Sequence, residues 1–539
     1  MMTIRPALPK SLTLRPRRAA LMLGTVAMMA MASVASAESV TWVRSLDAAS
    51  LDVHSRNEGV TITLLKHLYE PLVERANDGS LLPRLATDWQ MLPDDPAVWQ
   101  FKIREGVTFH DGTPLTAADV VFSLQRAQDE GSGFRSYLSS VAEITAPDDY
   151  TVNMRLVGVS PIFPTNLTPI MIMSADWAAA NDSLTPQAAG STDVNYATTH
   201  ENGTGRYQLH SREVDVASHL TAYDAHWSGQ IPAVDDITFR VISDPSTRLA
   251  ALLSGEADFV QDVPVQDVER LRETAGINLV DGPENRIIYF GYDVSSDSLM
   301  SSNVDGNPFA DARVREAIAL AFNRDAIHRV VMRGQSVPAG VAVPPFVDGW
   351  TPELDAYAAP DIAGATALLA EAGYPDGFSV QLDCPNDRYL NDEAICIATA
   401  GMLGQIGIDV TVAGASMAIV SPKVIGDQSD FFLLGAGVPT FDSAYLFDVL
   451  YHSKTGAYGA YNGSRLADPA LDARIEALAS EVDIDARSAA MTGIWQTLKD
   501  EFIVLPVHSQ VLSYAMREGL SLPVHPENIP NLADMQVAQ

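Results

Sequence analysis

Residues 378–412 carry the pattern that most constrains the fold of this chain. Residues 378–384 alternate in polarity and are rich in β-forming residues, which predicts a strand. A helix is predicted over residues 391–406, and Gly407 separates it from a second predicted strand over residues 408–412. The apolar residues of that helix at helical spacing are Ala394, Ile397, Ala398, Met402 and Ile406. A strand, a helix and a strand within about 35 residues predict a βαβ unit, in which a right-handed crossover joins parallel strands.

Two more helices and another strand are predicted near this unit. Asp311 is placed to cap a helix. The predicted buried stripe of that helix is Val314, Ile318 and Phe322. Residues 364–372 predict the second helix, because a glycine and a proline follow it closely. Residues 430–434 predict a short buried strand that opens into a loop over residues 435–439.

The rest of the chain points to the same fold class. Residues 98–103 and 151–156 alternate as antiparallel strands with one buried face do. Short predicted strands and helices alternate throughout, without an internal repeat or a Gly/Ser linker. The sequence therefore predicts an α/β protein with mixed sheets, and its 539 residues suggest about three domains.

The net charge of the chain limits the kinds of molecule that it can bind. Asp and Glu number 68 against 35 Lys and Arg, for a formal net charge of −33. So negative a surface repels phosphate backbones and anionic lipid headgroups. We therefore expect no nucleic-acid partner.

The N-terminus has the order of a secretory signal peptide. Arg15, Arg17 and Arg18 precede a mainly apolar run over residues 19–34, and the small residues 35–37 follow. Cleavage after them would start the mature chain at Glu38. The apolar run is short for a membrane span, which needs about 20 residues; an uncleaved anchor and a twin-arginine signal are the alternatives. We expect a periplasmic protein.

Cys384 and Cys396 are the only two cysteines. An oxidising compartment would permit a bond between them. Two separate buried thiols are the alternative, and the sequence does not decide between the two arrangements. Two cysteines make neither a disulfide scaffold nor a cysteine-based zinc site.

Motifs of common enzymes are absent from the sequence. It contains no P-loop, no HExxH helix and no G-x-S-x-G elbow. The closest histidines, His210, His219 and His226, have spacings that suit no single metal-binding turn. We expect no catalysis, no metal and no cofactor.

Several segments, taken in order, resemble one family. The most specific reads Trp99-Gln-Phe-Lys-Ile-Arg-Glu-Gly-Val-Thr-Phe-His-Asp-Gly-Thr-Pro-Leu-Thr-Ala-Ala-Asp-Val120. Shorter matches lie at residues 69–74, 82–89, 203–207, 226–227, 248–258, 309–318, 372–377 and 461–472. Together they resemble the family 5 extracellular solute-binding proteins, which are the peptide-, nickel- and opine-binding components of bacterial ABC importers.

The resemblance implies a periplasmic binding protein-like fold with two lobes and an inserted extra domain. Mapped onto this chain, the first lobe comprises residues 38–72, 203–285 and 506–539. The inserted domain comprises residues 73–202, and the second lobe residues 286–505. The predicted βαβ unit then belongs to the second lobe.

Ligands of open α/β sheets bind beyond the carboxyl ends of the strands. The loop after the predicted strand 378–384 carries Arg388, whose guanidinium suits a carboxylate. The loop after the predicted strand 430–434 carries Asp442, which could pair with an ammonium. The family resemblance also places these two residues near the termini of a bound dipeptide. A structural salt bridge or exposed charges are the alternatives.

Aromatic residues near these loops are candidates for the walls of the pocket. They are Tyr389, Phe441 and Tyr445, and each could instead belong to the core. Two positions depart from the family pattern. Ala436 stands where many members have a tryptophan, and the strand over residues 289–293 ends in Asp293 where asparagine is common. The ligand could differ accordingly.

The sequence thus predicts a monomeric binding protein that captures a di- or oligopeptide by hinge closure. It would deliver the peptide to an ABC permease at the inner membrane. A nickel chelate, an opine, a sugar or another small amine is the alternative ligand. An exported hydrolase is the alternative from another functional class.

Overall fold

An 11-stranded mixed sheet runs through the computed structural model, which describes residues 38–188, 191, 194–455 and 458–538. Its order is β15-β14-β16-β12-β17-β11-β1-β10-β9-β8, with β13 paired to β17. Its strands are β1 (Glu38–Arg44), β8 (Tyr207–Glu213), β9 (Ala217–Ala222), β10 (Val234–Val241), β11 (Phe259–Val260), β12 (Ile277–Tyr292), β13 (Ser336–Pro338), β14 (Phe378–Pro385), β15 (Ile408–Ala415), β16 (Phe431–Gly437) and β17 (Val504–Arg517). The predicted signal peptide covers residues 1–37, which lie outside the described residues.

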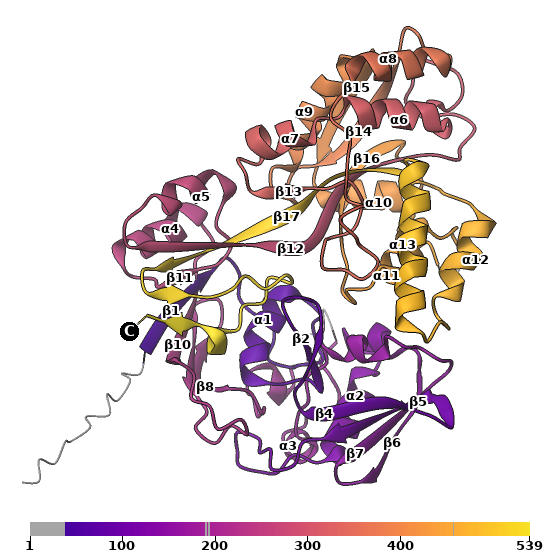
Figure 1. Cartoon of the computed structure of the whole chain (residues 1–539). Coiled ribbons are helices and arrows are strands. Elements are labelled where there is room, and N and C mark those ends of the chain that lie inside the picture. The colour runs from indigo at the N-terminus through magenta and orange to yellow at the C-terminus, as the bar shows by residue number, and fades with distance from the viewer. Residues whose placement is uncertain (1–37, 189–190, 192–193, 456–457, 539) are drawn as a thin grey trace, which may run out of the picture. The chain divides into compact units, whose positions relative to one another are not determined.

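Strands β12 and β17 are the link between the two ends of this sheet. They pair with each other in antiparallel fashion over most of their length and run side by side in Figure 1. β12 also pairs with β16, and β17 also pairs with β11. The register between β12 and β17 shifts between Pro283 and Ile287. Proline has no N–H to donate to the ladder, which accounts for an irregularity at this point.

The predicted βαβ unit is confirmed. β14 and β15 pair in parallel from Phe378↔Ile408 onward, and α9 (Asp392–Gly404) connects them. The apolar residues named at helical spacing do not all lie on the buried side: Ala394 is exposed and Ile397 is 59% exposed, whereas Ile406, just after the helix, is 4% exposed. The residues that α9 buries are Asp392, Ile395, Cys396, Thr399 and Leu403. A bond from Cys396 to β14 holds the face carrying that cysteine against the sheet.

The two other predicted helices are present. In α6 (Ala312–Ala321), the Asp311 side chain caps the helix by accepting a hydrogen bond from the Arg313 backbone. The predicted stripe is buried, as Val314, Ile318 and Phe322 are each at most 1% exposed. α8 (Ile362–Glu371) begins two positions earlier than predicted. These helices share a core with β14 and α9, and Figure 1 shows them together.

Strand β16 is longer than predicted. It continues through Gly437, and Gly435 pairs with Ile288 of β12, so the expected loop over residues 435–439 is wrong at its first three positions. A Cβ at Gly435 would lie 2.7 Å from both Ile288 Cδ1 and Tyr389 Cε1. The absence of a side chain at Gly435 therefore lets the Ile288 and Tyr389 side chains pack against the β16 backbone, which is a known role of glycine within strands.

A separate antiparallel sheet has the order β4-β5-β7-β6. Its strands are β4 (Ala86–Leu92), β5 (Asp95–Ile103), β6 (Val141–Asp148) and β7 (Thr151–Leu156). The predicted strands over residues 98–103 and 151–156 are confirmed as the paired strands β5 and β7. The side chains of this sheet share one core with β1 and α1 (Gly59–Leu68). The boundaries of the three predicted domains stay a prediction.

The remaining elements are short strands and helices. The strands are β2 (Val73–Arg75), β3 (Leu81–Pro83), β18 (Leu520–Ser521) and β19 (Gln536–Val537). The α-helices are α2 (Ala117–Ala127), α3 (Ala175–Ala180), α4 (Pro245–Ser254), α5 (Val265–Arg272), α7 (Arg324–Ala326), α10 (Met417–Ile425), α11 (Ala444–Leu446), α12 (Pro469–Ala477) and α13 (Ile484–Asp500). The 3₁₀ and π turns are η1 (Arg135–Leu138), η2 (Phe163–Leu167), η3 (Tyr196–Thr198), η4 (Pro308–Ala310), η5 (Ile327–Val331), η6 (Phe447–Tyr451) and η7 (Leu532–Asp534). Within the described residues, no helix is both long enough and apolar enough to cross a bilayer.

Candidate functional site

A cavity of about 200 Å³ lies where the loops after β14 and β16 meet. β14 and β16 are parallel neighbours through Asp383↔Phe432, so their carboxyl ends share one edge of the sheet, as predicted. The cavity is lined by Tyr289, Tyr389, Met417, Ser421, Ile425, Leu434, Gly435, Ala436, Gly437, Tyr445, Leu446, Val449, Leu450 and Tyr461. Two predicted pocket residues, Tyr389 and Tyr445, are among them.

Tyrosines dominate the polar surface of this cavity. The Tyr389 hydroxyl donates a hydrogen bond to the Gly435 carbonyl at 3.2 Å. Within the described part of the chain, the hydroxyls of Tyr289, Tyr445 and Tyr461 have no hydrogen-bond partner. Burial raises the pKa of Tyr289, Tyr389 and Tyr445 above that of free tyrosine. These phenols are therefore neutral at neutral pH and can both donate and accept.

Ala436 is the departure from the family pattern that matters for this cavity. Its side chain is part of the wall, and a methyl group leaves open the space that a larger side chain would fill. The other departure, Asp293, lies elsewhere. Asp293 is fully buried, forms an ion pair with Arg465 and accepts hydrogen bonds from the backbone of Ser295 and Ser296.

Arg388 lies beside the cavity with an unpaired guanidinium. Its guanidinium carbon is 5.5 Å from the centroid of the Tyr389 ring, and the residue is exposed. Across the residues that the structure describes, the Arg388 side chain forms no ion pair and no hydrogen bond. Its backbone is fixed, because the Arg388 and Tyr389 amides both donate to Asp392 Oδ2, at 3.1 and 3.0 Å.

A second arginine near Tyr389 was not predicted. The guanidinium carbon of Arg286, on β12, is 5.9 Å from the Tyr389 centroid. Its Nε atom donates to Glu284 at 3.3 Å, so this arginine is already paired. Arg286 is 102 positions from Arg388, and nothing in the local sequence marks it as a neighbour of the predicted site.

The two cysteines are bonded, which resolves the alternative that the sequence left open. Cys384 ends β14, Cys396 lies in α9, and both are fully buried. The bond closes the loop that carries Arg388 and Tyr389. The predicted carboxylate-binding residue is therefore held on a covalently closed loop.

Asp442 does not line the cavity. Both of its carboxylate oxygens accept hydrogen bonds from Arg487 of α13, and Oδ1 also accepts from the Ala444 amide at 2.9 Å. Asp442 and Arg487 are 4% and 3% exposed. The structural salt bridge, which was the alternative for Asp442, is thus present. The predicted role of Asp442 toward a ligand stays a prediction.

Phe441 also lies outside the cavity wall. Its ring packs against Phe346, with centroids 5.4 Å apart, and the guanidinium carbon of Arg75 lies 4.4 Å from its centroid. Arg75 belongs to β2 and also donates to the Pro439 carbonyl at 3.4 Å. Phe441 therefore marks a contact between the β2 region and the loop after β16.

Comparison with known proteins agrees with this architecture. A family model described as bacterial extracellular solute-binding proteins, family 5 middle, matches residues 80–458. The glutathione-binding protein GsiB of Pectobacterium atrosepticum is 27% identical over 456 residues, covering 83% of this chain and 84% of that protein. GsiB of Escherichia coli O1:K1 is 29% identical over 394 residues, covering 72% of this chain and 71% of that protein.

Solved structures share the fold. HbpA2 from Haemophilus parasuis has a TM-score of 0.80 and 22% identity, covering 93% of this chain and 100% of that one. The dipeptide-binding protein from Pseudoalteromonas sp. SM9913, solved with Met-Leu, has a TM-score of 0.71 and 19% identity, covering 93% and 100%. The predicted α/β binding-protein fold is therefore confirmed. Since the family model spans well over half of the sequence, the chain belongs to family 5 of the bacterial extracellular solute-binding proteins, which serve ABC importers.

Proposed function

We propose that this protein is a periplasmic receptor that captures a short peptide with a free carboxylate and delivers it to an ABC permease. The observation that carries the proposal is the unpaired Arg388 guanidinium beside a cavity walled by tyrosines. A guanidinium matches the planar fork of a carboxylate, and the phenols supply donors and acceptors for the peptide groups.

The size of the cavity favours a small ligand. Its volume of about 200 Å³ is below the range of about 300–1,000 Å³ that is usual for drug-sized ligands. A dipeptide or tripeptide would place one side chain among the tyrosines and keep its carboxylate near Arg388. The relatives named as glutathione-binding proteins make glutathione, a tripeptide, a natural first ligand to test.

The carboxylate, more than the amine, should set the affinity. No carboxylate side chain is among the residues that line the cavity. Asp442 carries its charge only as half of a buried pair with Arg487. We therefore expect amidation of the C-terminus of the ligand to weaken binding more than acetylation of its N-terminus.

Hinge closure about β12 and β17 is the motion that we propose for capture. These two strands are the link between the ends of the sheet, and their ladder is irregular between Pro283 and Ile287. We also propose that the protein binds its ligand as a monomer. It leaves its ligand chemically unchanged, so chromatography should recover the ligand intact.

Isothermal titration calorimetry tests the proposal. The panel contains glutathione, Met-Leu, longer peptides, an opine, a sugar and nickel–histidine. Arg388→Ala should weaken peptide binding by at least about 10-fold, because a charge-assisted hydrogen bond contributes about 1.5–3 kcal/mol. Arg329→Ala, at another exposed arginine, is the matched control and should change nothing. Tight binding of an opine, a sugar or a nickel chelate, without any peptide, would replace the peptide as the ligand.

Ala436→Trp tests the cavity itself. The indole should fill the space beside Tyr389 and lower peptide affinity by at least about 10-fold, while the melting temperature stays close to that of the wild type. Ala436→Ser is the control, since it adds a single oxygen to the same wall. Unchanged affinity in Ala436→Trp would show that the ligand binds elsewhere.

A further inference from the structure

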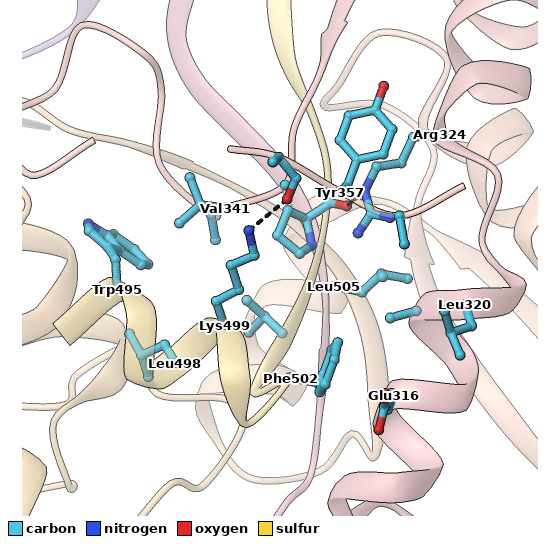
Figure 2. Close-up of a pocket in the computed structure, with 17 residues that line it drawn as sticks. Glu316, Leu320, Arg324, Val341, Tyr357, Trp495, Leu498, Lys499, Phe502 and Leu505 are labelled. Carbon is cyan, nitrogen blue, oxygen red and sulfur yellow. Dashed lines mark hydrogen bonds between the residues drawn. The ribbon is translucent and has the colours of Figure 1, made fainter. Parts of the chain in front are cut away.

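A second cavity, of about 250 Å³, lies between α6, α13 and β17 (Figure 2). It shares no lining residue with the tyrosine-lined cavity. Most of its wall is apolar. The large apolar side chains around it include Leu320, Val341, Trp495, Leu498, Phe502 and Leu505.

Arg324 brings a positive charge to this apolar space, and its guanidinium carbon lies 5.4 and 5.3 Å from the ring centroids of Phe322 and Tyr357. The residue is 6% exposed, and its Nε atom donates to the carbonyls of Ala339 and Pro506 at 2.8 and 2.9 Å. These two bonds fix the guanidinium plane. In the described part of the chain, Arg324 forms no ion pair, and its two terminal nitrogens have no hydrogen-bond partner. Asp355 attracts this guanidinium without touching it. A buried charge without a carboxylate in direct contact is costly, so an anion in the cavity would be stabilised beside it.

The surroundings keep Arg324 charged and add a second cation. Burial lowers the pKa of Arg324 to about 10, so it remains protonated at neutral pH. Lys499 of α13 also lines the cavity, and its ammonium donates to the carbonyls of Leu354 and Ala356 at 2.5 and 2.6 Å. An ammonium has three donors, which leaves one for a ligand. Glu316 is the acidic residue of the wall, and Figure 2 shows it well apart from the labelled Arg324 side chain.

We propose that this cavity is an accessory binding site for a small apolar carboxylate, separate from the peptide site. The carboxylate would accept hydrogen bonds from the free guanidinium nitrogens of Arg324, with Lys499 as a second cation. The hydrocarbon or aromatic body would fill the space between α6 and α13. The volume limits that body to a few carbon atoms or one ring, such as that of benzoate.

Fluorine NMR on the purified protein tests this site with 4-fluorobenzoate as the probe. We expect saturable binding in the millimolar range or tighter. The neutral analogue 4-fluorobenzamide should bind at least about 10-fold more weakly, because it lacks the charge that Arg324 recognises. Absence of saturation at about 10 mM, where specific binding is already weak, would overturn the proposal and leave a cavity that holds water only.

Two variants assign the probe to this cavity. Ala319→Leu adds volume at a half-buried position of the wall and should reduce probe binding at least about 10-fold. Lys499→Met keeps the aliphatic stem, removes one cation and should weaken binding less. The control is Ala436→Trp, which closes the tyrosine-lined cavity and should leave probe binding unchanged. If Ala436→Trp abolished the signal and Ala319→Leu preserved it, or if the benzamide bound equally well, the proposal would be wrong.

Discussion

Asp442 shows how far the role of one residue depends on its partner. Read from the sequence, it is an acidic residue on a loop at a strand end, suited to a ligand amine. In the fold, both carboxylate oxygens of Asp442 accept hydrogen bonds from Arg487, which lies in a helix 45 positions further along the chain. The pair is buried on both sides. Charges in such pairs stabilise each other, and loss of either one leaves the other without compensation.

Asp442→Leu should therefore destabilise the fold more than it affects the ligand. The unpaired Arg487 should reduce the free energy of unfolding in urea by about 3–5 kcal/mol. The double variant Asp442→Leu/Arg487→Met should recover most of that loss, since it buries no unpaired charge, and a double-mutant cycle measures the coupling. Weaker peptide binding at unchanged stability would instead return Asp442 to the ligand site.

Asp448 should make stability fall as the pH rises through mildly acidic values. Burial raises the pKa of this carboxyl to about 6. Near the unfolded pKa of about 4 the unfolded chain begins to lose this proton, whereas the folded chain holds it up to about pH 6. Ionisation therefore favours the unfolded chain across that window. Above about pH 6 the loss of unfolding free energy caused by ionised Asp448 is constant.

Asp448→Asn removes this penalty. We expect the variant to exceed the wild type in unfolding free energy by about 1–3 kcal/mol at pH 8 and by little at pH 4. Urea titrations at both values measure the difference. If the variant and the wild type differed in unfolding free energy by the same amount at pH 4 and pH 8, the folded-state pKa of Asp448 would not be raised.

At the scale of elements, the disulfide connects β14 and α9 and closes the loop of Arg388. Cys384→Ala/Cys396→Ala should lower the free energy of unfolding by about 3 kcal/mol, from loop entropy for a closed loop of about 13 residues. Peptide affinity should fall as well, because Arg388 is then held only by the hydrogen bonds to Asp392. Dithiothreitol should reproduce both effects in the wild type and have none in the double variant. If neither the double variant nor the reduced wild type lost stability, the disulfide would not stabilise the fold.

Elements differed in how well the sequence predicted them. The βαβ unit, the capped helix α6 and the strand pair β5–β7 follow from local periodicity and were found as predicted. The end of β16 was missed, since glycine in a window of sequence indicates a loop, while Gly435 serves a close approach to Tyr389. For α9, the sequence supplied apolar residues at helical spacing but not the identity of the buried face. A helix with apolar residues on several sides does not reveal by itself which of them a disulfide holds against the sheet.

At the scale of the whole molecule, Arg75 should help to hold the β2 region against the loop after β16 when a ligand is bound. It contacts both Pro439 and the Phe441 ring on the loop after β16. Arg75→Gln should lose about 1–2 kcal/mol of cation–π and hydrogen-bond energy, which corresponds to about 10-fold in peptide affinity. The compaction that small-angle X-ray scattering detects on ligand addition should also shrink.

Arg135→Gln, at an exposed arginine, is the control for this experiment. Both the affinity and the scattering change should then match the wild type. An Arg75→Gln protein that compacts fully and binds normally would show that this contact does not contribute to closure.

The family, the α/β class and the loop that carries Arg388 and Tyr389 at the edge of the sheet could be predicted from local sequence, whereas Tyr445 lies in the short helix α11 that follows the next loop. Short stretches of sequence are enough to predict these features, because the periodicity of apolar residues and the capping residues act on neighbouring residues in the chain. Only the packed fold shows that Arg286 approaches Tyr389, that Tyr289 and Tyr461 join the same wall, and that Asp442 forms an ion pair with Arg487. Such contacts join residues far apart in the chain, and their strength depends on burial and distance, which exist only once the strands and helices have packed.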